Sequence, residues 1–259
     1  MQVSALGKQF EVSPANHLSF WNEVSSGTWE RATFAIFDRF LDREHSYIDI
    51  GAWIGPTVLY GCQLAKTAYG LEPDPLAYAE LEQNIALNKV IANNVRLFNA
   101  CIAPQSGQVT LGSRGQGNDS TSSLLFAKKK THWTVKAFSF ADFVRQQGIA
   151  DCNFIKIDVE GGEYQLLPTM MEYLRMHRPT LHLSLHPIYL KIRPLGWPGR
   201  VLARWTQTSK ILRCIGFYKH IYDHNGRELT PRQLLWRSLA KVSLDVVLTD
   251  REWNAPASA

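Results

Sequence analysis

The chain has 259 residues, a length typical of one domain with a substantial core and small additions. Hydrophobic residues make up 45% and charged residues 20%, and no apolar run approaches the roughly 20 residues that cross a bilayer. The net charge is +5, and the four cysteines have no C-x-x-C spacing, which argues against a disulfide framework or a cysteine-based zinc site. With no charged-then-apolar signal segment at its start, the sequence predicts a cytoplasmic protein without a transmembrane segment.

Segments with strand and helix patterns alternate along the chain. A helical region is predicted over residues 16–41, before a short buried strand at 47–50. Further strands are predicted at 68–71, 94–100, 154–159, 180–185, 217–222 and 244–248, with a hairpin starting at 107–111. Helices are predicted at 57–65, 76–88, 163–176 and 199–214. The alternation predicts an α/β domain with a mostly parallel sheet and helices on both faces, spanning 46–259 after a helical extension at 1–45.

The stretch YIDIGAWIGPTVLYG, residues 47–61, is predicted to form the first strand, a glycine turn and the start of a helix. In doubly wound folds ligands bind at such a turn, beyond the carboxyl ends of the strands. Gly51 and Gly55 would let the backbone approach a ligand. Glu72 lies 23 residues beyond Asp49, at the end of the second strand, where an acid can bind both ribose hydroxyls.

This turn departs from the dinucleotide fingerprint G-x-G-x-x-G. It has one glycine at the first turn, and Asp49 lies two residues before it. A carboxylate there would repel a pyrophosphate and attract an ammonium group. The turn therefore predicts a ligand with a ribose and a positive charge but no phosphate, and S-adenosylmethionine fits. The alternative is a tight strand–helix turn in some other α/β protein.

A second motif, FIKIDVEGGEYQLL at residues 154–167, places Asp158 and Glu160 at the end of a central strand. Side chains two apart on a strand share a face, so both can reach one cleft, and Lys156 shares that face. Charged groups inside an apolar strand are costly unless they are paired or used in function. A structural ion-pair network is the alternative interpretation.

The C-terminal third is strongly basic. Between residues 187 and 241 eleven lysines and arginines face two acids, so this segment carries +9 and the rest of the chain −4. Three tryptophans are interspersed in it, Trp197, Trp205 and Trp236. Stacking and cationic contacts, from Arg193, Arg200 and Arg204 among others, predict a glycan acceptor, including a phosphorylated one. A solvated basic face or a membrane surface are the alternatives; nucleic acid is disfavoured because no N-P-P-Y-type loop is present.

On these motifs the sequence resembles the FkbM-type family of S-adenosylmethionine-dependent methyltransferases over roughly residues 46–188. The matching segments are YIDIGAWIG, YGLEPDP, FNACIAPQSGQVTL, NDSTSSL and IKIDVEGGE. The resemblance implies a class I methyltransferase domain, which is a Rossmann-like three-layer sandwich. Its seven-stranded sheet is mostly parallel, with the last strand antiparallel. It also implies S-adenosylmethionine as the cofactor.

The resemblance further implies roles for the matching positions. The methionine part of the cofactor would be lined by Asp49, Gly51, Ala52 and Gly55. Glu72 would bind the ribose, and the adenine would lie near Pro73, Asp74, Asn99, Ala100 and Cys101. Asp158 would face the amino acid portion or the methyl group, and Glu160 the substrate. Family members often carry an acid at the position that Ser184 occupies here.

Methyl transfer to a hydroxyl is an in-line displacement in which a base takes the proton. His186 is the first candidate, because its ordinary pKa near 6.5 fits this task, and Glu160 is the second, or orients the histidine. A histidine bonded to a loop carbonyl is the alternative. A metal shared by His182, His186 and Asp158 is not expected, because the two histidines lie four residues apart on a strand.

These observations predict O-methylation of a small-molecule or glycosidic acceptor. An RNA methyltransferase and a non-catalytic cofactor-binding protein remain as alternatives. The polar loop at 118–123 could close over the cofactor or simply lie on the surface.

Overall fold

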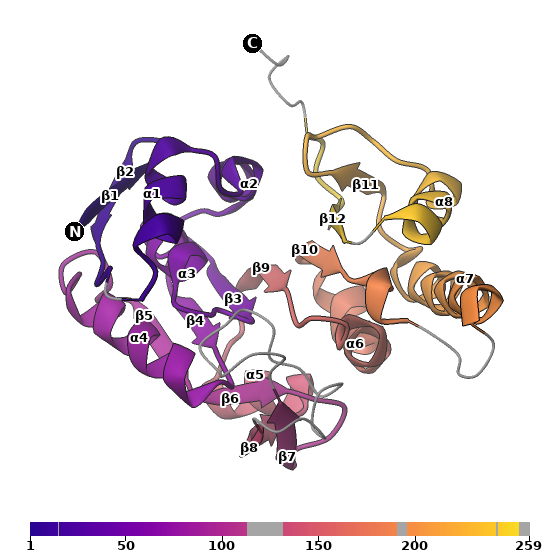
Figure 1. Cartoon of the computed structure of the whole chain (residues 1–259), viewed down its shortest axis with the longest axis horizontal. Helices are drawn as coiled ribbons and strands as arrows, with labels where there is room; N and C mark the ends of the chain where they lie inside the picture. The colour runs from indigo at the N-terminus through magenta and orange to yellow at the C-terminus, as the bar shows by residue number, and fades with distance from the viewer. Residues whose placement is uncertain (15, 113–131, 191–195, 242, 254–259) are drawn as a thin grey trace.

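The computed structural model describes residues 1–14, 16–112, 132–190, 196–241 and 243–253. Its centre is a seven-stranded sheet with the order β11-β12-β10-β9-β3-β4-β5 (Figure 1). The strands are β3 (Ser46–Ile50), β4 (Ala68–Leu71), β5 (Val95–Phe98), β9 (Cys152–Ile157), β10 (Thr180–Leu185), β11 (His220–Asp223) and β12 (Leu244–Thr249). All pairings are parallel except those of β12, which is antiparallel to both neighbours. The predicted class I sheet is confirmed.

Helices cover both faces of this sheet. They are α1 (Leu18–Ser26), α2 (Arg31–Phe40), α3 (Pro56–Gly61), α4 (Pro75–Ala86), α5 (Phe140–Gln147), α6 (Glu163–His177), α7 (Gly196–Ile215), α8 (Pro231–Ala240) and the 3₁₀ helix η2 (Pro187–Tyr189). None of the described helices is both long and apolar enough to cross a membrane.

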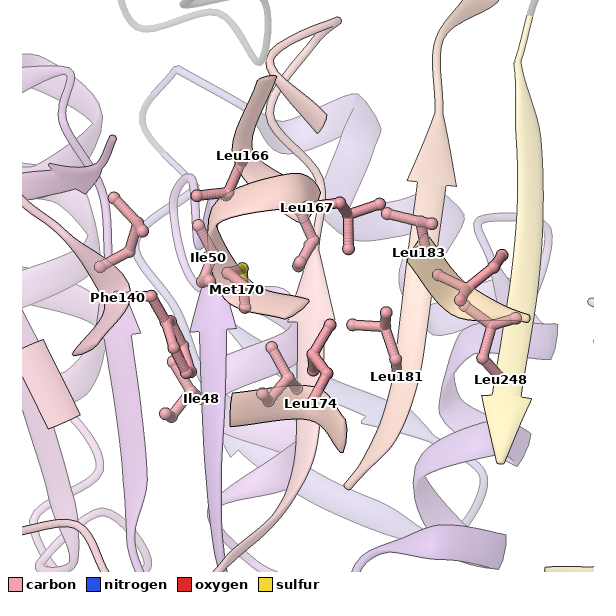
Figure 2. Packing of buried hydrophobic residues seen from close by; sticks show 14 of the residues in the cluster. Ile48, Ile50, Phe140, Leu166, Leu167, Met170, Leu174, Leu181, Leu183 and Leu248 are labelled. Carbon is pink, nitrogen blue, oxygen red and sulfur yellow. The ribbon is translucent and has the colours of Figure 1, made fainter. Parts of the chain in front are cut away.

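Strand β3 shows why both faces need cover. All five of its residues are buried, because alternate side chains point to opposite faces of the sheet. Tyr47 packs edge-on against Phe37 of α2, whereas Ile48 and Ile50 belong to the core cluster that includes α6. Figure 2 shows that second face, with the α6 residues Leu166, Leu167, Met170 and Leu174 packed over the sheet.

Several predicted boundaries were wrong. The strand predicted at 94–100 breaks at Asn99: β5 stays in the main sheet, whereas β6 (Ala100–Ile102) pairs with β8 (His132–Phe138). Strand β8 also pairs with β7 (Gly107–Gly112), so a separate three-stranded sheet forms. Helices α5 and α8 were not predicted. The predicted loop at 118–123 lies outside the described residues.

The first 45 residues are more than a helical extension. They begin with a hairpin, β1 (Gln2–Ala5) and β2 (Lys8–Glu11), and the predicted helical region is two helices separated at Gly27, which ends α1 in the left-handed conformation. Trp21, Phe34 and Phe37 are fully buried in a cluster shared with β3, β9 and β12. The segment therefore packs as part of the same core, and its boundary at residue 45 stays a prediction.

Candidate active site

A cleft of about 250 Å³ lies where the carboxyl ends of β3, β4, β9 and β10 meet. Nine of the predicted site residues line it: Gly51, Ala52, Glu72, Pro73, Ala100, Cys101, Asp158, Glu160 and His186. Four others lie behind its wall: Asp49, Gly55, Asp74 and Asn99. The two predicted motifs therefore meet in one place. The four residues behind the wall come from the first motif and from the segments that follow β4 and β5.

The turn after β3 is shaped by contacts within the protein. The N–H groups of Gly51 and Ala52 both donate to Leu71 O at 3.0 Å, which ties the turn to the end of β4. Gly51 has φ +93°, and a Cβ there would lie 1.9 Å from Asp158 O. Gly55 has φ +96°, and its Cβ would lie 2.5 Å from the Leu81 side chain. Both glycines are thus required by backbone conformation and packing, and the predicted close approach to a ligand stays a prediction.

Asp49 is fully buried and already neutralised. Its carboxylate accepts hydrogen bonds from Lys156 Nζ and Tyr47 Oη, each at 3.2 Å. Burial of Lys156 opposes its charged form, but Asp49 and Asp158 outweigh this, so the pKa of Lys156 is raised. The carboxylate that lines the cleft nearby is Asp158, so a direct contact between Asp49 and a cationic ligand stays a prediction.

Glu72 is held in place from the backbone. Trp53 N donates to Oε2 and Asp74 N donates to Oε1, each at 2.8 Å. Burial raises the pKa of Glu72 to about 7, although both hydrogen bonds oppose this shift. Each carboxylate oxygen keeps a second lone pair, so a fixed bidentate acceptor faces the cleft.

Two residues predicted to lie near the adenine, Asp74 and Asn99, form hydrogen bonds with Glu72. Asp74 caps α4, because its Oδ1 accepts from Leu76 N at 2.9 Å and Ala77 N at 3.4 Å. Asn99 Nδ2 donates to Glu72 O at 2.9 Å, at the break between β5 and β6. Cys101 lines the cleft, and burial raises its pKa to about 12, so its thiol is neutral.

His186 lies among carboxylates. Its Nδ1 is hydrogen-bonded to Oε1 of the buried Glu163, and its Nε2 lies 3.7 Å from both Asp158 Oδ1 and Glu160 Oε1. Burial opposes protonation, but the bond to Glu163 and the three negative charges raise the pKa of His186 to about 9. The prediction of an ordinary histidine pKa is therefore wrong, because these carboxylates favour the protonated form of His186.

The ligating atoms of Asp158, Glu160 and His186 lie within 4.8 Å of one another, so this trio could also hold a metal ion. These three residues differ from the metal ligands considered in the sequence analysis, which were His182, His186 and Asp158. His182 is buried within the sheet, where burial lowers its pKa to about 3, and it is absent from the residues that line the cleft.

Three acids of the site were missed from the sequence. Glu30, which precedes α2, lines the cleft from the N-terminal segment; it stays accessible from the cleft, yet burial and the charge of Asp158 raise its pKa to about 7. Asp245 on β12 lies opposite Ser184 and hydrogen-bonds with it, so an acid reaches the Ser184 position from the neighbouring strand. Glu163 lies in the quoted motif DVEGGE and is the first residue of α6, and an acid directly after the two glycines was the available signal.

Among the described residues of the basic segment 187–241, no lysine or arginine lines the cleft. Trp197, Trp205 and Trp236 lie on α7 and α8, with exposed fractions of 75%, 43% and 58%. Arg204 is a structural clamp: its Nε donates to Pro187 O at 3.0 Å and its Nη1 to Leu239 O at 2.6 Å. Arg193 lies outside the described residues. The three tryptophans thus lie outside the cleft lining, and stacking of an acceptor on them stays a prediction.

Comparison with known proteins places this geometry in a family. Residues 49–203 match the model of the methyltransferase FkbM domain. A methyltransferase FkbM from Methylobacillus flagellatus KT is similar in structure, with a TM-score of 0.49 and 17% identity over 80% of this chain and 44% of that one. This chain thus spans less than half of the length of that protein.

Two further solved structures are similar. A putative transferase from Pyrococcus horikoshii has a TM-score of 0.48 and 12% identity over 96% of this chain and 70% of that one. An rRNA methylase from Streptococcus thermophilus has a TM-score of 0.45 and 9% identity over 85% and 94% of the two chains. A search of curated proteins found no match.

Proposed function

Because the chain belongs to the methyltransferase FkbM family, we propose that it transfers the methyl group of S-adenosylmethionine to a hydroxyl oxygen of a small-molecule or glycosidic acceptor. One observation carries the proposal. The backbone-held carboxylate of Glu72 lines the same cleft as the group formed by Asp158, Glu160 and His186. The cleft therefore joins a ribose-binding acid to a charged group that can activate a hydroxyl.

The charges in the cleft support a cationic nucleoside. Five carboxylates line it, from Glu30, Glu72, Asp158, Glu160 and Asp245, against Lys156 and His186 as its cations. Lys156 is already bonded to Asp49 and to Gly51 O. An ammonium group is favoured in such a field and a pyrophosphate is repelled, which separates S-adenosylmethionine from NAD. A phosphate on the acceptor would for the same reason lie outside the cleft.

Five of the lining residues have a proposed part in binding the cofactor. Glu72 accepts hydrogen bonds from the ribose hydroxyls, and Asp158 accepts one from the ammonium group. Pro73, Ala100 and Ile102 supply an apolar wall for the adenine. S-adenosylmethionine supplies an electrophilic methyl group, and the cleft contributes mainly alignment.

The acceptor proton is assigned to His186. Glu163 keeps a hydrogen bond to Nδ1, so Nε2 is the nitrogen that faces Asp158, Glu160 and the acceptor. A positive charge bound beside Asp158 offsets the field that holds the proton on His186, and its pKa falls towards the ordinary value. His186 then accepts the hydroxyl proton at Nε2, and Glu163 stabilises the imidazolium that forms. The histidine becomes a base only when the cleft is loaded.

Calorimetry and single-turnover transfer test the proposal. S-adenosylmethionine should bind and NAD should not. His186→Gln should bind the cofactor within about threefold of wild type but transfer methyl groups at least 100-fold more slowly. NAD binding in the cleft, or unchanged transfer by His186→Gln, would contradict the assignment. A product formed only on RNA would contradict the acceptor class.

A further inference from the structure

Helices α7 and α8 expose a face that the proposed function leaves unused. Along α7, Trp197, Val201 and Trp205 recur every four residues, and Leu202 lies three before Trp205, so they share one side of the helix. Trp205 meets Trp236 of α8 edge-on, with ring centroids 6.2 Å apart. Trp197, Leu202, Trp205 and Trp236 are 75%, 49%, 43% and 58% exposed. We call these four residues the tryptophan face.

The charge around the tryptophan face has one sign. Neither α7 nor α8 contains an aspartate or glutamate, whereas Arg200, Lys210, Arg213 and Arg232 are exposed on them and Lys241 follows α8. The two acids in this part of the chain are already paired. Asp223 lies 3.0 Å from Arg237, and Glu228 lies 2.8 Å from His220. Nothing acidic on these helices offsets their basic residues.

We propose that the tryptophan face docks on the surface of a lipid bilayer that contains anionic lipids. Tryptophan is favoured at the boundary between headgroups and acyl chains, because its ring is apolar and its N–H can still reach water. Arginine and lysine beside such rings are attracted by anionic headgroups. A protein partner would need acidic groups arranged around an apolar pocket. An anionic bilayer offers negative headgroups and apolar acyl chains over an area that both helices can contact.

The tryptophan face is connected to the cleft. Arg204, next to Trp205, donates to Pro187 O, and Pro187 directly follows His186. In the same turn Ile188 is 40% exposed, and Tyr189 donates a hydrogen bond to Glu160. Docking therefore brings the bilayer against the segment that borders the acceptor side of the cleft. An acceptor carried on a lipid would reach the cleft from this side; this last step alone rests on the proposed function.

Vesicle sedimentation tests the docking. We expect the full chain to sediment with vesicles of phosphatidylcholine containing about 30% phosphatidylglycerol, and not with phosphatidylcholine alone. Its tryptophan emission should shift to the blue on binding. Trp197→Ser with Trp236→Ser should weaken binding about tenfold, and Arg200→Gln with Lys241→Gln should weaken it several-fold and reduce its salt dependence.

A matched control distinguishes docking through the tryptophan face from nonspecific adsorption of exposed apolar side chains to vesicles. Leu76→Ser with Val90→Ser removes two side chains that are 57% and 87% exposed elsewhere on the protein, and it should leave vesicle binding unchanged. All variants should have the circular dichroism spectrum and the urea unfolding midpoint of wild type, which shows that they fold whether or not the proposed function holds. The proposal is overturned if anionic vesicles do not bind, if the control weakens binding as much as the tryptophan variants, or if the tryptophan face binds RNA and not vesicles.

Discussion

The two ends of the cleft are held in different ways. At the β4 end, Glu72 is fixed by the N–H groups of Trp53 and Asp74, and the turn before it is fixed by Leu71 O. At the β10 end, Glu30, Asp158, His186 and Asp245 arrive from separate elements and influence one another mainly through charge. Backbone hydrogen bonds make the first end rigid, whereas the second can change its protonation when a charged ligand binds.

Lys156 contacts residues at both ends of the cleft. We therefore expect its substitution to lower the free energy of unfolding more than the other substitutions below. Lys156→Met leaves Asp49 as a buried carboxylate without its cation, so we expect a loss of about 3–5 kcal/mol in the free energy of unfolding. Urea denaturation measures it. Lys66→Met is the control, because Lys66 makes an ion pair with Asp151 at the surface, and its loss should leave stability almost unchanged. Equal effects of the two changes would show that the buried pair does not join the ends.

Rigidity of the β4 end can be broken at Gly51. An alanine Cβ would meet Asp158 O and would also strain a positive φ, so Gly51→Ala should cost about 3 kcal/mol. Gly148→Ala isolates the strain, because Gly148 has φ +63° with no atom within 4 Å of an added Cβ, and it should cost about 1 kcal/mol. If both variants unfold at the same urea concentration, the close approach to β9 is unimportant.

The contribution of Glu72 at the β4 end can be measured through ligand affinity. Glu72→Ala removes two charge-assisted hydrogen bonds to the ribose, so we expect S-adenosylmethionine to bind about 100-fold more weakly by calorimetry. Because the pKa of Glu72 is about 7 and the ribose favours the ionised form, wild-type affinity should also rise as the pH increases through 7. The alanine variant should lack this rise, and an identical pH profile in both proteins would exclude Glu72 as its source.

Charge coupling at the β10 end predicts a smaller effect on stability. The folded-state pKa of His186 is about 9 and the unfolded value is about 6.5, so the folded protein binds more protons between these pH values. The stabilising contribution is complete below pH 6.5 and is lost as the pH rises through 9, by about 2 kcal/mol. Thermal unfolding of wild type and His186→Gln measures it. The variant should show a flatter profile over this window, and parallel profiles would contradict the assignment.

The difference between the two ends also explains what the sequence could predict. Residues 47–75 contain the whole β4 end in one short stretch, so its strand, its turn and the cleft acid Glu72 could be identified directly from the sequence. The β10 end depends on cross-strand register, which places Asp245 opposite Ser184, and on a left-handed residue, Glu30, far upstream. Neither follows from local pattern. His186 was identified, but its pKa was not, because three carboxylates from α6, the end of β9 and the turn after it decide it.

Three of the predicted site residues hold other parts of the protein in place and do not line the cleft. Asp49, Asp74 and Asn99 carry the expected residue types at the expected positions, yet their side chains bond to Lys156, the α4 backbone and Glu72 O. Spacing shows that a residue is close to the cleft but not whether it faces it. Likewise the composition of the C-terminal third indicated cationic and aromatic contacts, and only the exposure of α7 and α8 showed where they lie.

The packing of α2 has a consequence for how the chain folds during synthesis. Arg39 donates to Glu252 O, Arg251 donates to Phe40 O, and Phe40 meets Trp253 edge-on. Helix α2 therefore completes these contacts only after residues 251–253 have been made, more than 200 residues after the helix itself. Because contacts so far apart in the sequence form slowly, we expect this side of α2, including Phe40, to be covered late in folding.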